Sequence, residues 1–208
     1  MMAVRKLAPP PVCEREIMRY AGCRTADEGV EVLLKDCLSE ALPLLTYMVC
    51  FDEIDPAPFI ARSEQLRRNL EGCERVVLMA ATVGVGLDRL IAKYGRLSPA
   101  KAILLQAIGT ERVEALCDAF CDEVAQEIGL TARPRFSPGY GDLSLEVQRE
   151  VITLLQAGKR IGVTLNDSFL MSPSKSVTAF VGYSRDRKKA VDRCRVCKKT
   201  DCAFRGAT

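Results

Sequence analysis

Helical spacing of the apolar residues predicts two long helices in this chain. Apolar positions recur every three or four residues after residue 28, which predicts an amphipathic helix that ends at Pro43. A longer helical pattern begins at Ser98, where a capping serine precedes a proline, and runs to Ile128 with an expected break at Gly109. The buried stripe of this second helix comprises Val113, Leu116, Cys117, Phe120, Val124 and Ile128.

Continuous apolar or β-branched runs predict the strands. The strand-like runs cover residues 45–51, 76–81, 161–165 and 176–183. A helical pattern closed by Gly158 precedes the run at residues 161–165. Shorter helices are expected over residues 63–70, 87–94 and 147–155. Because strands and helices interleave in irregular order, the sequence predicts an α+β fold with a twisted, mainly antiparallel sheet and flanking helices.

Length and composition narrow the class of protein. The 208 residues suit one domain with a tail, and 48% hydrophobic and 27% charged residues are ordinary for a globular protein. No apolar run approaches the roughly 18 residues that span a bilayer. The first eleven residues lack the hydrophobic stretch of a signal peptide, so we expect a cytoplasmic protein that does not contact a membrane.

Charge and residue usage change this picture at the C-terminus. From residue 183 onward nine Arg and Lys residues face three Asp residues, whereas the rest of the chain has 21 basic and 24 acidic residues. A basic tail of this kind indicates an acidic partner or nucleic acid, or else a solvated segment. The chain has no histidine, which excludes a Ser-His-Asp triad, a Cys-His dyad and an imidazole ligand to a cobalt corrin.

The segment Arg135-Phe-Ser-Pro-Gly-Tyr140 combines the chemistry of a small-ligand loop. A guanidinium group binds a carboxylate bidentately, and a Pro-Gly turn lets the backbone approach a ligand. The phenol of Tyr140 is neutral near pH 7 and does not repel a methylsulfonium group. Taken alone, Arg with Pro-Gly-Tyr is also typical of an ordinary exposed turn.

This hexamer resembles the Arg-x-x-Pro-Gly-Tyr signature of the activation (reactivation) domain of cobalamin-dependent methionine synthase. The resemblance extends to residues 164–173 with the following Ser-Val-Thr, to Ile17-Met-Arg-Tyr-Ala-Gly22, and to residues 82–89. It implies an activation-like domain over residues 1–183, followed by a basic, cysteine-containing tail over residues 184–208.

The resemblance also implies a function. A stand-alone reactivation component would bind S-adenosylmethionine and support reductive methylation of cob(II)alamin, a methyltransferase step in methionine biosynthesis. The cobalamin would be held by a partner, the corrinoid-binding module of methionine synthase or of a related methyltransferase. The electron would come from an acidic donor such as a flavodoxin or ferredoxin.

Site residues follow from the resemblance position by position. Arg135 would anchor the methionine carboxylate, with Ser137 and Gly139 in the same ligand-binding loop. Tyr140 would face the cobalt and is the candidate catalytic residue. Asp118, on the preceding long helix, would receive the amine or ribose, with Glu114 as the second choice. The tyrosine pair that the family uses after its last strand is absent here or is supplied by Tyr183.

A cysteine trio in the tail predicts a metal site. Cys194, Cys197 and Cys202 stand among Arg and Lys residues, which favour the thiolate. Thiolates at this spacing suit zinc or an iron–sulfur cluster, with Cys13, Cys23 or a partner as the fourth ligand. Free thiols in a solvated tail are the alternative.

Two other classes of function stay open at this point. One is a non-catalytic redox or scaffold protein that carries a metal or iron–sulfur centre in its Cys tail. The other, a nucleic-acid-binding module, is disfavoured because aromatic residues make up only 6% of the chain and Phe204 is the one stacking residue of the tail.

Overall fold

A computed structural model describes residues 2–23 and 27–185 of the chain. Its centre is a five-stranded sheet in which every neighbouring pair is antiparallel, in the order β1-β2-β3-β7-β4. The strands are β1 (Ala3–Lys6), β2 (Met48–Glu53), β3 (Arg75–Thr82), β7 (Ser176–Ser184) and β4 (Thr131–Ala132). The long central pair β3–β7 aligns Arg75 with Tyr183 and Thr82 with Ser176. The predicted α+β class with a mainly antiparallel sheet is confirmed.

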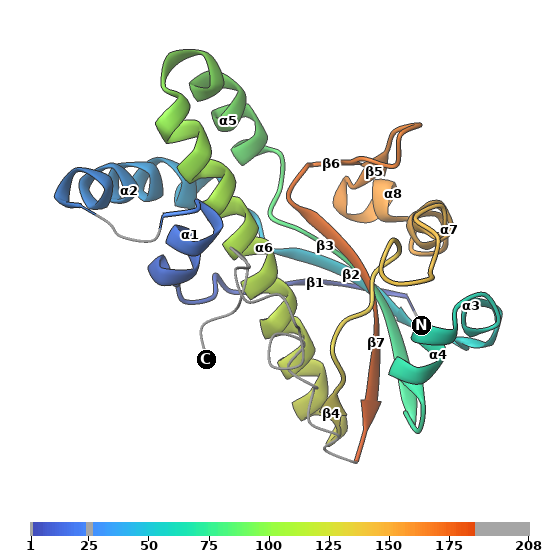
Figure 1. Ribbon diagram of the computed structural model, residues 1–208. Helices are drawn as coiled ribbons and strands as arrows, with labels where there is room; N and C mark the ends of the chain where they lie inside the picture. The colour runs from blue at the N-terminus through green and yellow to red at the C-terminus, as the bar shows by residue number, and fades with distance from the viewer. Residues whose placement is uncertain (1, 24–26, 186–208) are drawn as a thin grey trace.

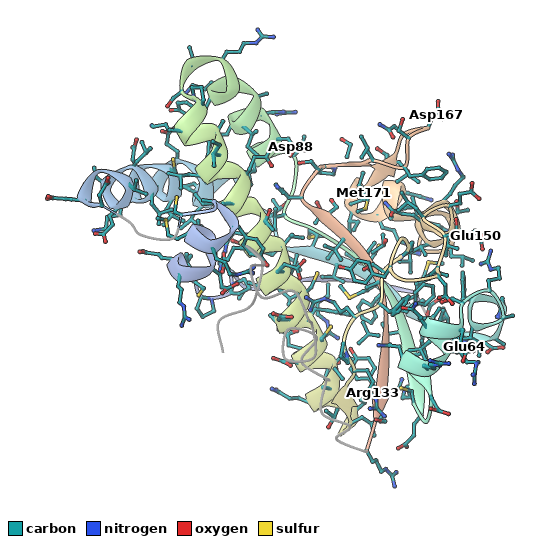
Figure 2. The ribbon with its side chains drawn as sticks, in the orientation of Figure 1. Glu64, Asp88, Arg133, Glu150, Asp167 and Met171 are labelled. Carbon is teal, nitrogen blue, oxygen red and sulfur yellow. The ribbon has the colours of Figure 1, made fainter. Side chains whose placement is uncertain are left out.

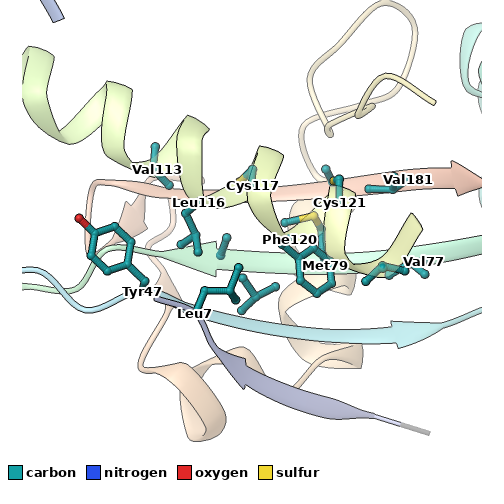
Figure 3. Packing of buried hydrophobic residues seen from close by; sticks show 14 of the residues in the cluster. Leu7, Tyr47, Val77, Met79, Val113, Leu116, Cys117, Phe120, Cys121 and Val181 are labelled. Atoms are coloured by element: carbon teal, nitrogen blue, oxygen red, sulfur yellow. The ribbon is translucent and has the colours of Figure 1, made fainter. Parts of the chain in front are cut away.

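One face of the sheet is covered by the long helix α6 (Pro99–Ile128), as Figures 1 and 3 show. Its predicted stripe packs on the inward side chains of the strands, among them Met79 and Val181. The helix ends at Gly129, which takes the left-handed conformation. The expected break at Gly109 is wrong, because α6 continues through it. A Cβ on Gly109 would lie 2.5 Å from Leu87 Cδ2, so this glycine permits a close helix contact.

Helices packed around the N-terminal half of α6 form a second layer (Figure 1). They are α1 (Glu14–Tyr20), α2 (Glu28–Ala41) with the 3-10 turn η1 (Leu42–Leu44), and α5 (Gly86–Leu97). The predicted end of α2 near Pro43 is confirmed. Asp27 caps α2 by accepting a hydrogen bond from the Val30 amide.

The opposite face of the sheet is covered by four short helices. They are α3 (Ala57–Ile60), α4 (Glu64–Leu70), α7 (Val147–Leu154) and α8 (Ala157–Ile161). Their apolar side chains pack on Leu78, Ala80 and Phe180. The helix predicted over residues 147–155 is confirmed as α7, but Gly158 does not close it, because a second helix that contains Gly158 follows a left-handed turn at Gln156.

A small hairpin follows α8, formed by β5 (Thr164–Leu165) and β6 (Met171–Ser172). The strand predicted over residues 161–165 is therefore shorter than expected, because Ile161 ends α8. The hairpin leads directly into β7, the strand predicted over residues 176–183. The hairpin and the start of β7 thus lie beside α7 and α8 (Figure 1).

A buried arginine fixes the N-terminal segment onto α6. Arg112 is fully buried and donates to the carbonyl oxygens of Pro10 and Pro11, at 2.6 Å each. Glu111 neutralises it and also accepts from the Cys13 amide at 3.1 Å. The prolines therefore connect an edge strand, β1, to α1.

Within the described residues, no helix has both the length and the apolar content needed to cross a membrane.

Candidate functional site

The loop from Arg135 to Tyr140 is held by its own backbone and by β7. Phe136 forms an isolated bridge with Phe180, each amide donating to the other carbonyl at 3.0 and 2.8 Å. The Tyr140 amide donates to the Ser137 carbonyl at 3.0 Å, which closes the predicted turn. Gly139 has a φ of +87°, a conformation that favours glycine at this position. These backbone contacts hold the loop against β7.

Asp142 ties the far end of this loop to α4. Its carboxylate accepts hydrogen bonds from the Ser63 hydroxyl and from the Glu64 amide, the latter at 2.9 Å. These bonds stabilise the ionised carboxylate, with that of Ser63 contributing most, and they lower the pKa of Asp142. The loop thus caps the N-terminus of α4 from outside the helix.

Arg135 contacts two carboxylates of α6. It donates from Nη2 to Glu114 at 2.6 Å and from Nη1 to Asp118, one turn further along the helix. Burial disfavours the charge of Arg135, but the neighbouring acids outweigh burial and raise its pKa above the ordinary value. The guanidinium is therefore a permanent cation held in a fixed position.

These side chains line a cavity of about 690 Å³ between α6, the loop and the start of β7. Of the residues predicted for the ligand site, Arg135, Ser137, Tyr140, Asp118 and Glu114 all line this cavity. Gly139 does not line it and instead shapes the turn. Tyr140 is 47% exposed at the cavity, and its ring meets Phe136 edge-on at 6.1 Å between centroids.

The cavity lies where the sheet is incomplete. Strand β4 pairs with Tyr183 and Ser184, and Phe136 pairs with Phe180, but no strand within residues 2–23 and 27–185 pairs with this edge of β7 between Ser176 and Ala179. Ser176, Val177 and Thr178 line the cavity at this open edge. Figure 2 shows two further lining residues, Arg133 and Met171, near opposite ends of β7.

Sequence reasoning missed several lining residues. Gln148 on α7, Met171 on the hairpin, and Ser176 and Thr178 on β7 come from elements far from the loop in the sequence. Their one sequence signal is the hairpin-to-strand segment that carries the family resemblance. Nothing in the sequence around Gln148 indicates that this side chain faces a cavity.

The lining has three acidic residues, Glu114, Asp118 and Asp122, and two basic ones, Arg133 and Arg135. Burial raises the pKa of both Cys117 and Cys121, so these neighbours of Arg135 are neutral thiols near pH 7. The formal charge of the lining is therefore slightly negative.

The predicted metal ligands Cys194, Cys197 and Cys202 lie outside the described residues. Cys13 is exposed and Cys23 is partly buried. In the part of the chain that the structure describes, no three His, Cys, Asp or Glu side chains are grouped so that they could hold a metal ion. The tail site stays a prediction.

Comparison with known proteins gives one informative result. No protein-family profile matches the sequence, and a search of curated proteins finds no relative. Among solved structures, the chain is similar to the MetH reactivation domain bound to AdoHcy, with a TM-score of 0.61 and 17% identity over 90% of this chain and 80% of that chain. At this identity the likeness shows that the two share a fold.

Proposed function

We propose that this protein binds S-adenosylmethionine in the cavity beside Arg135 and supports reductive methylation of the cobalamin of a partner protein. The observation that carries the proposal is the meeting of Arg135, Ser137, Tyr140 and Asp118 at one cavity. The loop motif and the resemblance in the sequence point to the same four residues. The neighbour with the same fold is bound to AdoHcy, the demethylated form of the same ligand, which supports the proposal.

The cavity suits this ligand in size and charge. Its volume of about 690 Å³ lies within the range of small-molecule sites. A guanidinium has five N–H donors, and the contacts with Glu114 and Asp118 leave others for the ligand carboxylate. The same two acids can accept from the ligand ammonium, so the amino-acid end meets both signs of charge.

The role of the chain is positioning. Tyr140 is exposed at the cavity, where its phenol can flank the sulfonium without adding a charge. The partner's oxidised cobalamin is a substrate: it takes one electron from a donor protein and the methyl group from S-adenosylmethionine, which leaves S-adenosylhomocysteine. The chain has no histidine and supplies no imidazole to cobalt, which is consistent with a corrinoid that arrives on another protein.

Calorimetry of the full chain tests ligand binding. We expect saturable heat with S-adenosylmethionine, and a loss of at least tenfold in affinity for Arg135→Ala, because a charge-assisted contact is removed. Arg62→Ala is the matched control, since Arg62 also binds a carboxylate, that of Glu150, but on the opposite side of the sheet from α6. Absence of heat at millimolar ligand would reject the proposal.

A spectroscopic assay tests the second half of the proposal. Mixing the protein with a cobalamin-bearing partner, a reductant and S-adenosylmethionine should produce methylated cobalamin, detected by its visible absorbance. We expect no change when the protein or S-adenosylmethionine is omitted. Equal methylation without the protein would contradict its role in reactivation.

A further inference from the structure

We infer that Gln148 selects adenine in this cavity. The open backbone edge of β7 at Thr178 supplies a second set of hydrogen-bonding groups for the base. The inference rests on the proposed function and concerns the nucleobase end of the same site. It assigns a specificity-determining role to a residue that the loop motif does not contain.

Gln148 is a buried amide that faces the cavity. It is 5% exposed, lies in the first turn of α7 and belongs to the cavity lining. Its side chain makes one hydrogen bond, from Nε2 to the Phe169 carbonyl at 3.4 Å. Because a carbonyl can only accept, this contact fixes which end of the amide is nitrogen.

The Gln148 side chain has hydrogen-bonding groups beyond the one that binds Phe169. Within residues 2–23 and 27–185, the Oε1 atom of Gln148 has no hydrogen-bond partner, and Nε2 keeps a second N–H. Oε1 is not one of the fully buried, unpartnered side-chain atoms of the described residues, so it reaches solvent and is available to a ligand in the cavity. The cavity is the place from which such a ligand would come.

The backbone of β7 supplies a second hydrogen-bonding edge. The Phe180 amide and carbonyl bond to Phe136, and the Gly182 carbonyl accepts from the Arg133 amide. Backbone groups alternate sides with a period of two along a strand, so those of Thr178 point to this same side. Since no described strand pairs there, Thr178 presents its N–H and C=O to the cavity.

Adenine matches this arrangement. Its amino group donates beside a ring nitrogen that accepts, and a Gln amide binds such an edge with two hydrogen bonds. Hypoxanthine has a carbonyl oxygen in place of the amino group, which would face Oε1 acceptor to acceptor. The Arg135 end of the cavity then takes the amino-acid part, and the end near Gln148 takes the base.

Calorimetry with two product ligands, S-adenosylhomocysteine and S-inosylhomocysteine, tests the inference on the full chain. We expect the wild type to prefer the adenine ligand by about 10-fold to 100-fold. Gln148→Met keeps the length of the side chain but removes both hydrogen-bonding groups, and it should reduce this preference to about threefold or less. Gln126→Met is the control, since Gln126 is exposed near the end of α6 and outside the cavity.

The outcomes separate this inference from the proposed function. If the wild type binds both ligands equally, or if a folded Gln148→Met protein keeps the preference, Gln148 does not select the base although the binding function stands. If neither of these ligands nor S-adenosylmethionine binds to the wild type, the inference about Gln148 and the proposed function are both rejected. Circular dichroism checks folding, and Gln148→Leu, which also removes both hydrogen-bonding groups, gives a second variant that should lose the preference too.

Discussion

Arg135 donates from Nη2 to Glu114 at 2.6 Å, and its other terminal nitrogen bonds Asp118 on the next turn of the same helix. One cation thus engages two of the three acidic residues in the cavity. Asp122, a further turn along α6, has no ion pair or hydrogen bond with any residue of ranges 2–23 and 27–185. Asp122 is therefore the acid of the cavity lining that Arg135 does not engage.

This distribution predicts selectivity by charge. S-adenosylmethionine carries one more positive charge than S-adenosylhomocysteine, so the cavity should bind the methylated form more tightly. Asp122→Asn should reduce the ratio of the two affinities by about two- to fivefold, as expected for an exposed charge pair. Calorimetry measures both ligands, and Glu31→Gln on α2, which removes an exposed carboxylate outside the cavity, should leave the ratio unchanged.

Asp142 should control the loop rather than contact the ligand. Asp142→Ala removes the hydrogen bonds to Ser63 and to the amides of α4, so we expect a lower melting temperature and several-fold weaker ligand binding. The stabilisation from Asp142 is complete above its unfolded pKa of 3.8 and is lost as pH falls through its lower folded pKa. Asp167→Ala, at the hairpin tip in Figure 2, is the control and should change neither quantity.

Two helical glycines should respond in opposite directions to alanine. A Cβ on Gly109 would lie 2.5 Å from Leu87 and 2.7 Å from the Lys175 side chain, so Gly109→Ala should destabilise by about 1–3 kcal/mol. Gly95 on α5 has nothing within 4 Å of that position, so Gly95→Ala should stabilise by about 0.5–1 kcal/mol. Urea denaturation measures both, and equal effects would show that the contact at Gly109 does not constrain α6.

The buried thiol of Cys50 predicts a loss of stability at alkaline pH. Burial raises its pKa from 9.0 to about 11, so the thiol ionises first in the unfolded chain. Stability is complete below pH 9 and should decline by up to about 2–3 kcal/mol as pH rises through the folded value. Urea denaturation between pH 8 and 11 under reducing conditions measures this slope. Cys50→Ala should show a smaller slope, and an unchanged slope would assign the effect to other groups.

Much of the fold could be predicted from local pattern. The stripe of α6, the apolar run of β3 and the end of α2 each follow from spacing that tertiary contacts reinforce. The break expected at Gly109 is wrong because the glycine serves a contact with α5 and Lys175, which no local pattern records. Strand β1 was not predicted, because it depends on long-range contacts. These are its pairing with β2 and the hydrogen bonds from Arg112 to Pro10 and Pro11.

The site could be predicted only in part, for a similar reason. The chemistry of Arg135 and Tyr140 is visible in a six-residue motif, and the structure brings both to one cavity. The engagement of Arg135 by Glu114 depends on the position of the loop across α6, which the sequence does not give. Gln148 is a common residue in an ordinary helix, and its burial against β7 and the hairpin is what distinguishes it.

Because one edge of β7 is open, substitutions along this strand should have two different effects, one on folding and one on ligand binding. Val181 and Ala179 point into the packed layer under α6, so substitutions there change folding. Ser176 and Thr178 border the cavity, so substitutions there act first on whatever the cavity holds. A protein engineer can therefore vary Ser176 and Thr178 to change ligand preference while leaving Ala179, Phe180 and Val181 of the core unchanged.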